Sequence, residues 1–217
     1  LYYQLPIGER GGWSFGQSAY IKKHSNWYQW PNEDPDSRSG INFRHIRLAD
    51  VYLMYAEAIL QANGAAAVSE AISYIDRIRT RAGVITLDQY MTDNAGQIPE
   101  LHISIQVHGS RSYTNATADA VLTHIMKVER PLELCFEGHR WKDLVRWGIV
   151  KEQFDALRAD EKWREDNFTT IVDQEPLLIV ERIRPDFILS SQNYSPETHD
   201  YFPIPTGEKQ INDQIGG

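Results

Sequence analysis

The sequence predicts a mainly α-helical chain in which helices pair as in tetratricopeptide repeats, with irregular loops and short strands between them. Two consecutive stretches, 46–63 and 66–82, carry apolar residues at helical spacing, and a glycine follows each. Together they are close to the tetratricopeptide period of about 34 residues. A third stretch, 117–137, has an apolar stripe that steps by four, three, four and three residues.

Composition limits the class of protein. The chain has 217 residues, a formal net charge of −8 and 41% hydrophobic residues, enough for a folded core. The acidic balance argues against a broad nucleic-acid interface, and no apolar run is long enough to cross a bilayer. The single cysteine, Cys135, excludes an internal disulfide. Because the residues after Leu1 read as a loop and not as a signal peptide, we expect a fragment.

Residues 1–45 are expected to form an irregular, aromatic-rich segment, because glycine and proline recur along it. We take four of its aromatic residues as candidate ligand-binding residues: Trp13, Trp27, Tyr28 and Trp30. A flat aromatic ring stacks on the apolar face of a sugar at small entropic cost. Polar neighbours are available for the sugar hydroxyl groups, namely Asn26, Asn32 and Asp34. The alternative is that the rings pack the loops onto the helices.

The first two predicted helices form one repeat-like pair. Gly64 and Gly83 occupy the positions expected for left-handed C-terminal caps. The second helix has its apolar residues on one face, with Arg77 and Arg81 on the opposite, solvated face. A lone pair cannot bury both of its faces. Since the sequence contains no second copy, we expect the neighbouring repeats to lie outside this chain.

The third helix follows a polar insertion at 84–116, in which 101–107 is a candidate short strand. We expect Thr117 or Asp119 to be the N-cap of this helix. Its predicted buried stripe consists of Val121, Ile125, Val128, Leu132 and Cys135. Pro131 lacks the N–H that would bond to the carbonyl of Lys127, so it is expected to bend the helix.

Two shorter helices are predicted after Gly138, at 139–147 and about 149–159. The charge-dense stretch 158–166 indicates a solvated surface, and 170–205 reads as extended pieces and turns. We therefore divide the chain into the segment 1–45 and a helical domain at 46–217, which contains the variable insertion at 84–116.

Three glutamates, Glu129, Glu133 and Glu137, repeat every four residues on the third helix. They are candidates for a glycosidase carboxylate pair or for ligands of a hard cation. Hydrolysis needs carboxylates on two sides of a substrate, whereas these share one helix face. We therefore favour a structural role, in which they pair with Arg130, Arg140, Arg146 or the arginines of the second helix.

No catalytic residue, metal site or cofactor is predicted. The seven histidines lack the spacing of zinc ligands, and Cys135 lies on an apolar stripe, where a small core residue is the usual interpretation.

Four stretches carry a resemblance to a known family: IRLADVYLMYAEAI at 46–59, AISYIDRIRTRAGV at 71–84, ERPLELCFEGHRWKDLVRWG at 129–148 and YFPIPTGEKQIN at 201–212. In this order and spacing they resemble the C-terminal half of the SusD/RagB family of outer-membrane nutrient-binding lipoproteins. The third stretch is very specific. Pro131 is a departure, since the family more often has a helix-forming residue there.

The resemblance implies a SusD-like fold of tetratricopeptide-like helix pairs, with an irregular segment that helps to form the ligand site. It implies a non-catalytic surface lipoprotein of the outer membrane, anchored through an N-terminal cysteine outside this chain. Such proteins cap a SusC-like TonB-dependent transporter and deliver oligosaccharides, or in some members peptides. Because family ligand contacts lie largely on variable loops, no site residue is transferred by position.

We interpret 129–148 as a corner of the fold, in which Trp141, Leu144 and Trp147 fill the apolar side of a helix joint. The favoured hypothesis is a glycan-binding protein of a nutrient uptake system. The alternatives are a peptide-binding member of the same family, a helical-repeat scaffold for a protein partner, and a glycosidase that uses the three glutamates.

Overall fold

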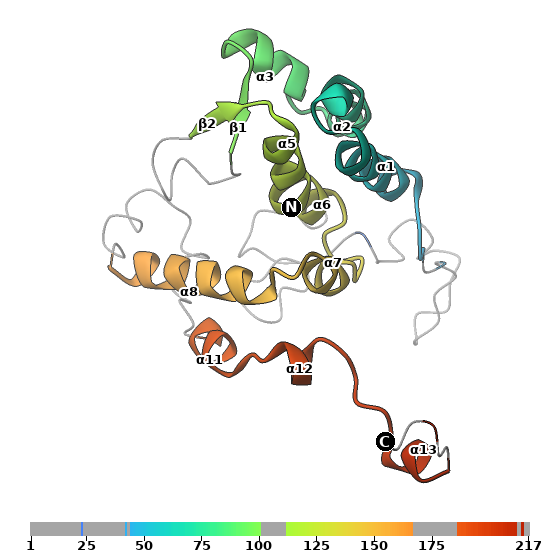
Figure 1. Ribbon diagram of the computed structural model, residues 1–217. Coiled ribbons are helices and arrows are strands. Elements are labelled where there is room, and N and C mark those ends of the chain that lie inside the picture. The colour runs from blue at the N-terminus through green and yellow to red at the C-terminus, as the bar shows by residue number, and fades with distance from the viewer. Residues whose placement is uncertain are drawn as a thin grey trace, which may run out of the picture.

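The computed structural model describes residues 44–100, 112–166 and 186–211, together with Lys23, Asn42 and Gln214. Within this part the chain is mainly α-helical with two short strands, so the predicted fold class is confirmed (Figure 1). Two predicted features lie outside the described residues. They are the strand at 101–107 and the aromatic residues Trp13, Trp27, Tyr28 and Trp30 with their polar neighbours Asn26, Asn32 and Asp34.

The first helix pair forms the largest part of the core. Helix α1 (Leu48–Asn63) and helix α2 (Val68–Ala82) lie side by side and are joined by the 3₁₀ turn η3 (Gly64–Ala67) (Figure 1). Small residues let the two helices approach closely, and the branched side chains between them are fully buried. The buried residues of the pair include Leu53, Ala56, Leu60, Ala71, Ile72, Ile75 and Ile78.

The two predicted glycine caps differ in detail. Gly83 has φ 71° and ψ 26°, the left-handed conformation expected after α2. Gly64 also has a positive φ of 55°, but its ψ of −131° lies outside the left-handed helical region, because the chain continues directly into the 3₁₀ turn. Both positions suit glycine, which has no Cβ to oppose a positive φ.

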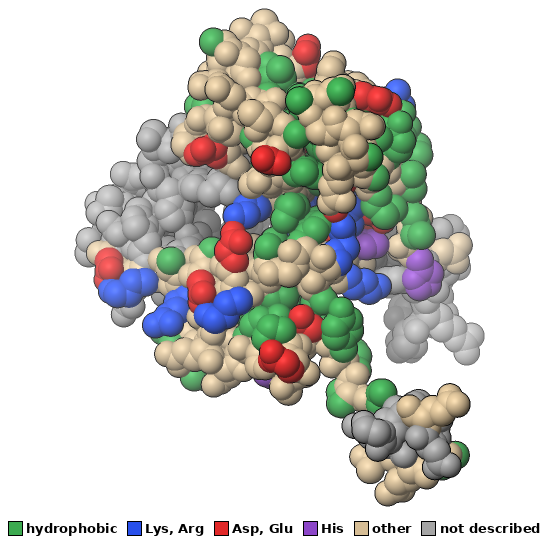
Figure 2. Space-filling model, in the orientation of Figure 1, with side chains coloured by type: hydrophobic (Ala, Val, Ile, Leu, Met, Phe, Trp, Pro, Cys, Tyr) green, Lys and Arg blue, Asp and Glu red, His purple; other side chains and the backbone are tan. Residues whose placement is uncertain are grey.

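The outer face of α1 is apolar and exposed. Leu48 is 62% exposed, and Val51, Met54 and Tyr55 lie on the same helix with about 40% exposure or slightly more. Figure 2 shows hydrophobic side chains gathered over this helix. A helix pair thus leaves one apolar face outward, as expected for a single repeat-like unit.

The insertion contains more regular structure than its sequence suggests. Helix α3 (Leu87–Asp93) begins at Thr86, whose hydroxyl oxygen accepts the N–H of Gln89 at 3.1 Å. Strand β1 (Gln97–Pro99) pairs antiparallel with β2 (Tyr113–Asn115). Helix α3 was not predicted, because seven residues are too few to show a helical period.

The third predicted helix is divided into three parts by a π turn. Helix α5 (Ala118–His124) leads into the π turn η4 (Ile125–Glu129) and then into α6 (Arg130–Glu133). The Thr117 hydroxyl oxygen accepts the Ala120 N–H at 3.2 Å, which confirms Thr117 as the N-cap. The N–H of Arg130 bonds to the carbonyl of Ile125, five residues earlier. This wider turn lies immediately before Pro131, where the sequence predicted an irregularity.

The predicted buried stripe of the third helix is correct before the π turn and wrong after it. Val121, Ile125 and Val128 are buried as expected, but Leu132 is 56% exposed and Cys135 is also exposed. Leu134 is buried instead. Since a π turn inserts an extra residue into the helix, it rotates Leu132 away from the face that an α-helical period assigns to it. Leu134 and Cys135 lie in the turn after α6, which ends at Glu133 and not at the predicted residue 137.

The remaining helices cover the lower part of the molecule in Figure 1. They are α7 (Arg140–Trp147), α8 (Val150–Asp166), α11 (Asp186–Asn193), α12 (Pro196–His199) and α13 (Thr206–Ile211). Helix α8 extends through the charged stretch 158–166, and Lys151 pairs with Asp155 on its surface at 2.9 Å. Figure 2 shows basic and acidic side chains next to one another along it.

The prediction of extended structure at 170–205 is wrong for two segments, because α11 and α12 are helical. Helix α11 packs against α8, where Ser191 is buried and bonds to Asp155, and the ring of Tyr194 meets that of Phe154 at 5.8 Å. Tertiary packing thus stabilises an eight-residue helix that is too short for its sequence pattern to identify.

Candidate functional site

The three glutamates of the corner are all paired with basic side chains. These glutamates are the catalytic candidates of the sequence. The carboxylate of Glu129 pairs with Arg79 and His124, and that of Glu133 pairs with Arg47 and Arg81. The carboxylate of Glu137 pairs with Arg47 and Lys23. The structural interpretation is confirmed, and the arginines of the second helix are among the partners. A carboxylate held by arginine is poorly suited to donate a proton, because the charge stabilises its ionised form.

The prediction that the glutamates pair with Arg130, Arg140 or Arg146 is wrong. Arg130, Arg140 and Arg146 lie on α6 and α7, yet none of them pairs with the three glutamates. Arg130 bonds to Asp50 and Asp143, Arg146 to Glu57 and Asp143, and Arg140 to the side chain of Gln153 and the carbonyl of Met126. The π turn and the turn after α6 direct each of these groups toward a different neighbour than a continuous helix would.

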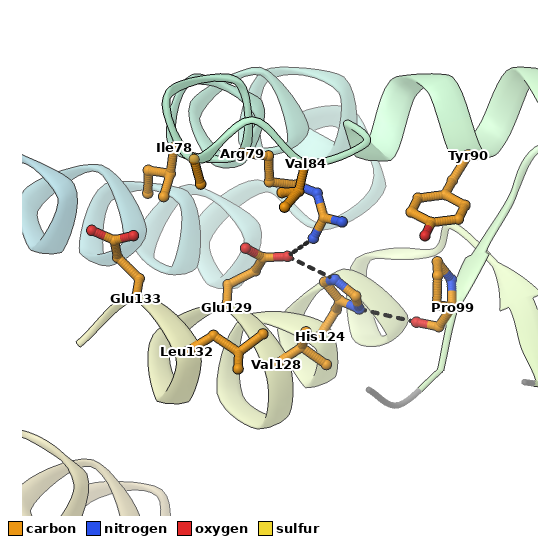
Figure 3. Close-up of a pocket in the computed structure, with 11 residues that line it drawn as sticks. Ile78, Arg79, Val84, Tyr90, Pro99, His124, Val128, Glu129, Leu132 and Glu133 are labelled. Atoms are coloured by element: carbon orange, nitrogen blue, oxygen red, sulfur yellow. Dashed lines mark hydrogen bonds and ion pairs between the residues drawn. The ribbon is translucent and has the colours of Figure 1, made fainter. Parts of the chain in front are cut away.

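Figure 3 shows a buried chain of polar groups that centres on Glu129. The imidazole of His124 is 2% exposed; its Nδ1 lies 3.0 Å from the carbonyl oxygen of Pro99 and its Nε2 2.9 Å from Oε1 of Glu129. Each ring nitrogen therefore lies within hydrogen-bonding distance of an oxygen atom. Burial alone would raise the pKa of Glu129, but the bond from His124 and the charges of Arg79 and His124 outweigh it and lower that pKa.

These groups line a cavity of about 240 Å³ between α2, α3 and the π turn. Its walls are largely apolar, with Ile78, Val84 and Leu132 beside the polar residues Arg79 and Glu129 (Figure 3). Glu129 and Glu133 both come from the same helix and lie along one side of the cavity. Glycoside hydrolysis uses two carboxylates that face each other across the substrate. Glu129 and Glu133 do not face each other across this cavity.

A second buried ion network joins the corner to α1. Arg130 is 3% exposed; its Nη1 donates to Asp50 on α1 at 2.7 Å and its Nε to Asp143 on α7 at 2.8 Å. Arg146 donates to both oxygens of Glu57, which also accepts the indole N–H of Trp147 at 2.8 Å. These pairs fix α1, α6 and α7 relative to one another.

The predicted apolar joint is only partly correct. Leu144 is buried at the joint, whereas Trp141 is 41% exposed, and Trp147 contributes its N–H as well as its ring. Gly138 has φ 80°, so it adopts the turn conformation expected at the corner.

Lys23, a residue of the segment 1–45, contacts this corner. Its ammonium group forms an ion pair with Glu137 and donates to the carbonyl oxygens of Glu133 at 2.9 Å and Cys135 at 3.0 Å. Those carbonyls belong to the last residue of α6 and to the turn just after it, where helical carbonyls lack intrahelical partners. Sequence reasoning missed both Lys23 and Arg47, since nothing in their local spacing identifies a partner about ninety or more residues away.

Acid is expected to weaken this attachment through Glu137. Burial raises the pKa of Glu137, but the hydrogen bonds from Arg47 and Lys23 outweigh it, so the pKa falls from 4.5 to about 2. A lowered pKa contributes stability above the ordinary value, and that stability is lost as the pH falls from about 4.5 to about 2. Urea unfolding across this range measures the loss. In Glu137→Gln that part of the pH dependence is expected to disappear; an unchanged profile would contradict the assignment.

Among the described side chains, no group of three His, Cys, Asp or Glu residues is placed to hold a metal ion. Among the described helices, none combines the length and the apolar character needed to cross a membrane.

Comparison with known proteins gives a consistent result. The model of the SusD family matches residues 11–216. The SusD-like protein P2 of Formosa agariphila is 32% identical over 116 residues, which cover 54% of this chain and 19% of that protein. The SusD-like protein P25 of the same organism is 35% identical over 111 residues, 51% of this chain and 16% of its own length.

A SusD-like protein of Bacteroides ovatus is 33% identical over 180 residues, which cover 80% of this chain and 27% of that protein. The chain thus spans about a quarter or less of the curated relatives that it matches. No solved structure matches it significantly.

Proposed function

The chain belongs to the SusD family, and from this we propose that it is part of a non-catalytic, cell-surface protein that binds an oligosaccharide nutrient and delivers it to a SusC-like TonB-dependent transporter. The observation that carries the proposal is the family match at 11–216, which includes both the helical corner and most of the aromatic-rich segment. The protein would be held at the outer membrane by a lipid anchor outside this chain.

The state of the glutamates supports binding without catalysis. All three corner carboxylates accept hydrogen bonds from arginine, lysine or histidine, and Glu129 and Glu137 have lowered pKa values. A glycosidase needs one carboxyl group with a raised pKa to act as general acid. The corner therefore serves the proposed protein as a brace between helices.

We assign ligand stacking to Trp13, Trp27, Tyr28 and Trp30. Lys23 supports this assignment because it is attached to the corner and lies four positions before Trp27 in the sequence. A residue adds at most about 3.5 Å to an extended chain, so the chain between Lys23 and Trp27 spans no more than about 14 Å. Covalent connection thus limits how far the backbone of Trp27 can lie from the corner.

The test is calorimetric titration of the native protein with a panel of oligosaccharides and a panel of peptides. We expect an oligosaccharide to bind, and Trp27→Ala or Trp30→Ala to weaken it about tenfold, since each loses a large stacking surface. Trp141→Ala on α7 is the matched control, because Trp141 is a half-exposed tryptophan outside the aromatic-rich segment. Binding of peptides alone would overturn the glycan assignment, and unchanged affinity in both variants would overturn the site.

A further inference from the structure

A basic pocket of about 350 Å³ lies where the beginning of α1, the end of α2 and the turn after α6 meet. Four basic residues line it: Lys23, Arg44, Arg47 and Arg81. They face two carboxylates, Glu133 and Glu137, which leaves a formal excess of two positive charges. The pocket therefore stands out on a chain whose formal net charge is −8, and Figure 2 shows basic side chains gathered between α1 and α7.

The inner part of the pocket is already paired. Arg47 donates to both Glu133 and Glu137, and Lys23 uses its three donors on Glu137 and two backbone carbonyls. Both carboxylates are thereby satisfied by cations. An additional cation would compete with arginine and lysine for these oxygens, so the pocket is unsuited to a metal ion or an amine.

The outer part retains free donors. Arg81 uses only its Nη2 on Glu133, at 2.5 and 2.6 Å, and its side chain is 59% exposed. Arg44 is exposed and forms no ion pair with another described residue. A guanidinium group presents a planar fork of donors that matches a carboxylate or a sulfate, and it loses less hydration than an ammonium group when it pairs.

We infer that this pocket binds an acidic group, a carboxylate or a sulfate ester, carried by the oligosaccharide. The inference rests on the proposed function, because it specifies the chemical class of the nutrient. Arg44 and Arg81 contact the anion. Arg47 and Lys23 hold the carboxylates of the pocket in place and add to its positive charge. Since Lys23 belongs to the aromatic-rich segment, ring stacking and charge recognition would act on one ligand.

The experiment titrates the native protein with matched ligands: an oligogalacturonate and its fully methyl-esterified form, and a sulfated oligosaccharide and its desulfated form. We expect one acidic member to bind about tenfold or more tightly than its neutral counterpart, with affinity that falls as salt is added. Which pair shows the difference identifies the carboxylate or the sulfate as the source of the charge.

Arg44→Gln and Arg81→Gln are each expected to weaken the acidic ligand about tenfold and to leave the neutral one unchanged. Glu133 keeps Arg47 in both variants, so the corner remains paired. Arg77→Gln is the control, because Arg77 lies one turn earlier on α2, stacks on Tyr52 and Tyr74, and is not part of the pocket. It should bind as the wild type does.

The outcomes separate the two proposals. Equal affinity for acidic and neutral members would overturn the acidic-ligand inference and leave the proposed function standing. Binding of acidic peptides with no binding of any saccharide would overturn both. Unchanged acidic affinity in both Arg44→Gln and Arg81→Gln would place the charge recognition elsewhere and overturn the pocket.

Discussion

Arg130→Ala is expected to lower the free energy of unfolding by about 3–5 kcal/mol, the usual cost of removing one partner from a buried ion network. Arg130 is almost fully buried, and it is placed between Asp50 on α1 and Asp143 on α7. Its removal would leave Asp50 as a buried carboxylate without this ion pair. Asp143 would keep its bond from Arg146, at 3.0 Å.

Urea unfolding followed by circular dichroism measures this loss. The matched control is Arg158→Ala, because Arg158 is an exposed arginine on α8, and its removal should change the free energy of unfolding by no more than about 0.5 kcal/mol. A loss below about 1 kcal/mol in Arg130→Ala would mean that the corner does not depend on this arginine.

Glu129→Ala is expected to destabilise the protein by about 3 kcal/mol, because it leaves the buried guanidinium group of Arg79 and the buried imidazole of His124 without their shared partner. Burial decides the size of the effect, since only 6% of the Glu129 side chain is exposed. Glu129→Gln keeps the shape and removes only the charge, so its loss should be smaller than that of Glu129→Ala.

The control for Glu129 is Glu152→Ala on α8. Glu152 also pairs with a basic residue, Lys127 at 2.6 Å, but its side chain is 57% exposed. An exposed ion pair contributes about 0–1 kcal/mol. Equal losses in Glu129→Ala and Glu152→Ala, measured by urea unfolding, would contradict the view that Glu129 belongs to a buried brace.

The helices that the sequence predicted well are those with long, regular apolar stripes. Helices α1 and α2 begin and end within two residues of their expected bounds, because many positions of each contribute to one period. Helices α3, α11 and α12 were missed, since they have only seven, eight and four residues, too few to show a helical period.

The corner shows why the partners in ion pairs were harder to predict than the helices. Spacing placed Glu129, Glu133 and Glu137 on one face and favoured a structural role, which the ion pairs confirm. The π turn before Pro131 then changed which face of the helix carries Leu132, which is exposed, and the helix ends at Glu133, so that Leu134 is buried from the turn that follows. Arg47 and Lys23 could not be named as partners, because their contacts with Glu137 depend on the tertiary fold.

We propose that the glutamate corner braces the helices of a binding protein and performs no chemistry on the ligand. The most direct measurement follows, in one sample, the fraction of an oligosaccharide bound by the native protein and the release of new reducing ends over time. We expect saturable binding without release, for the wild type and for Glu133→Gln alike. Release of reducing ends by the wild type that is lost in Glu133→Gln would contradict it.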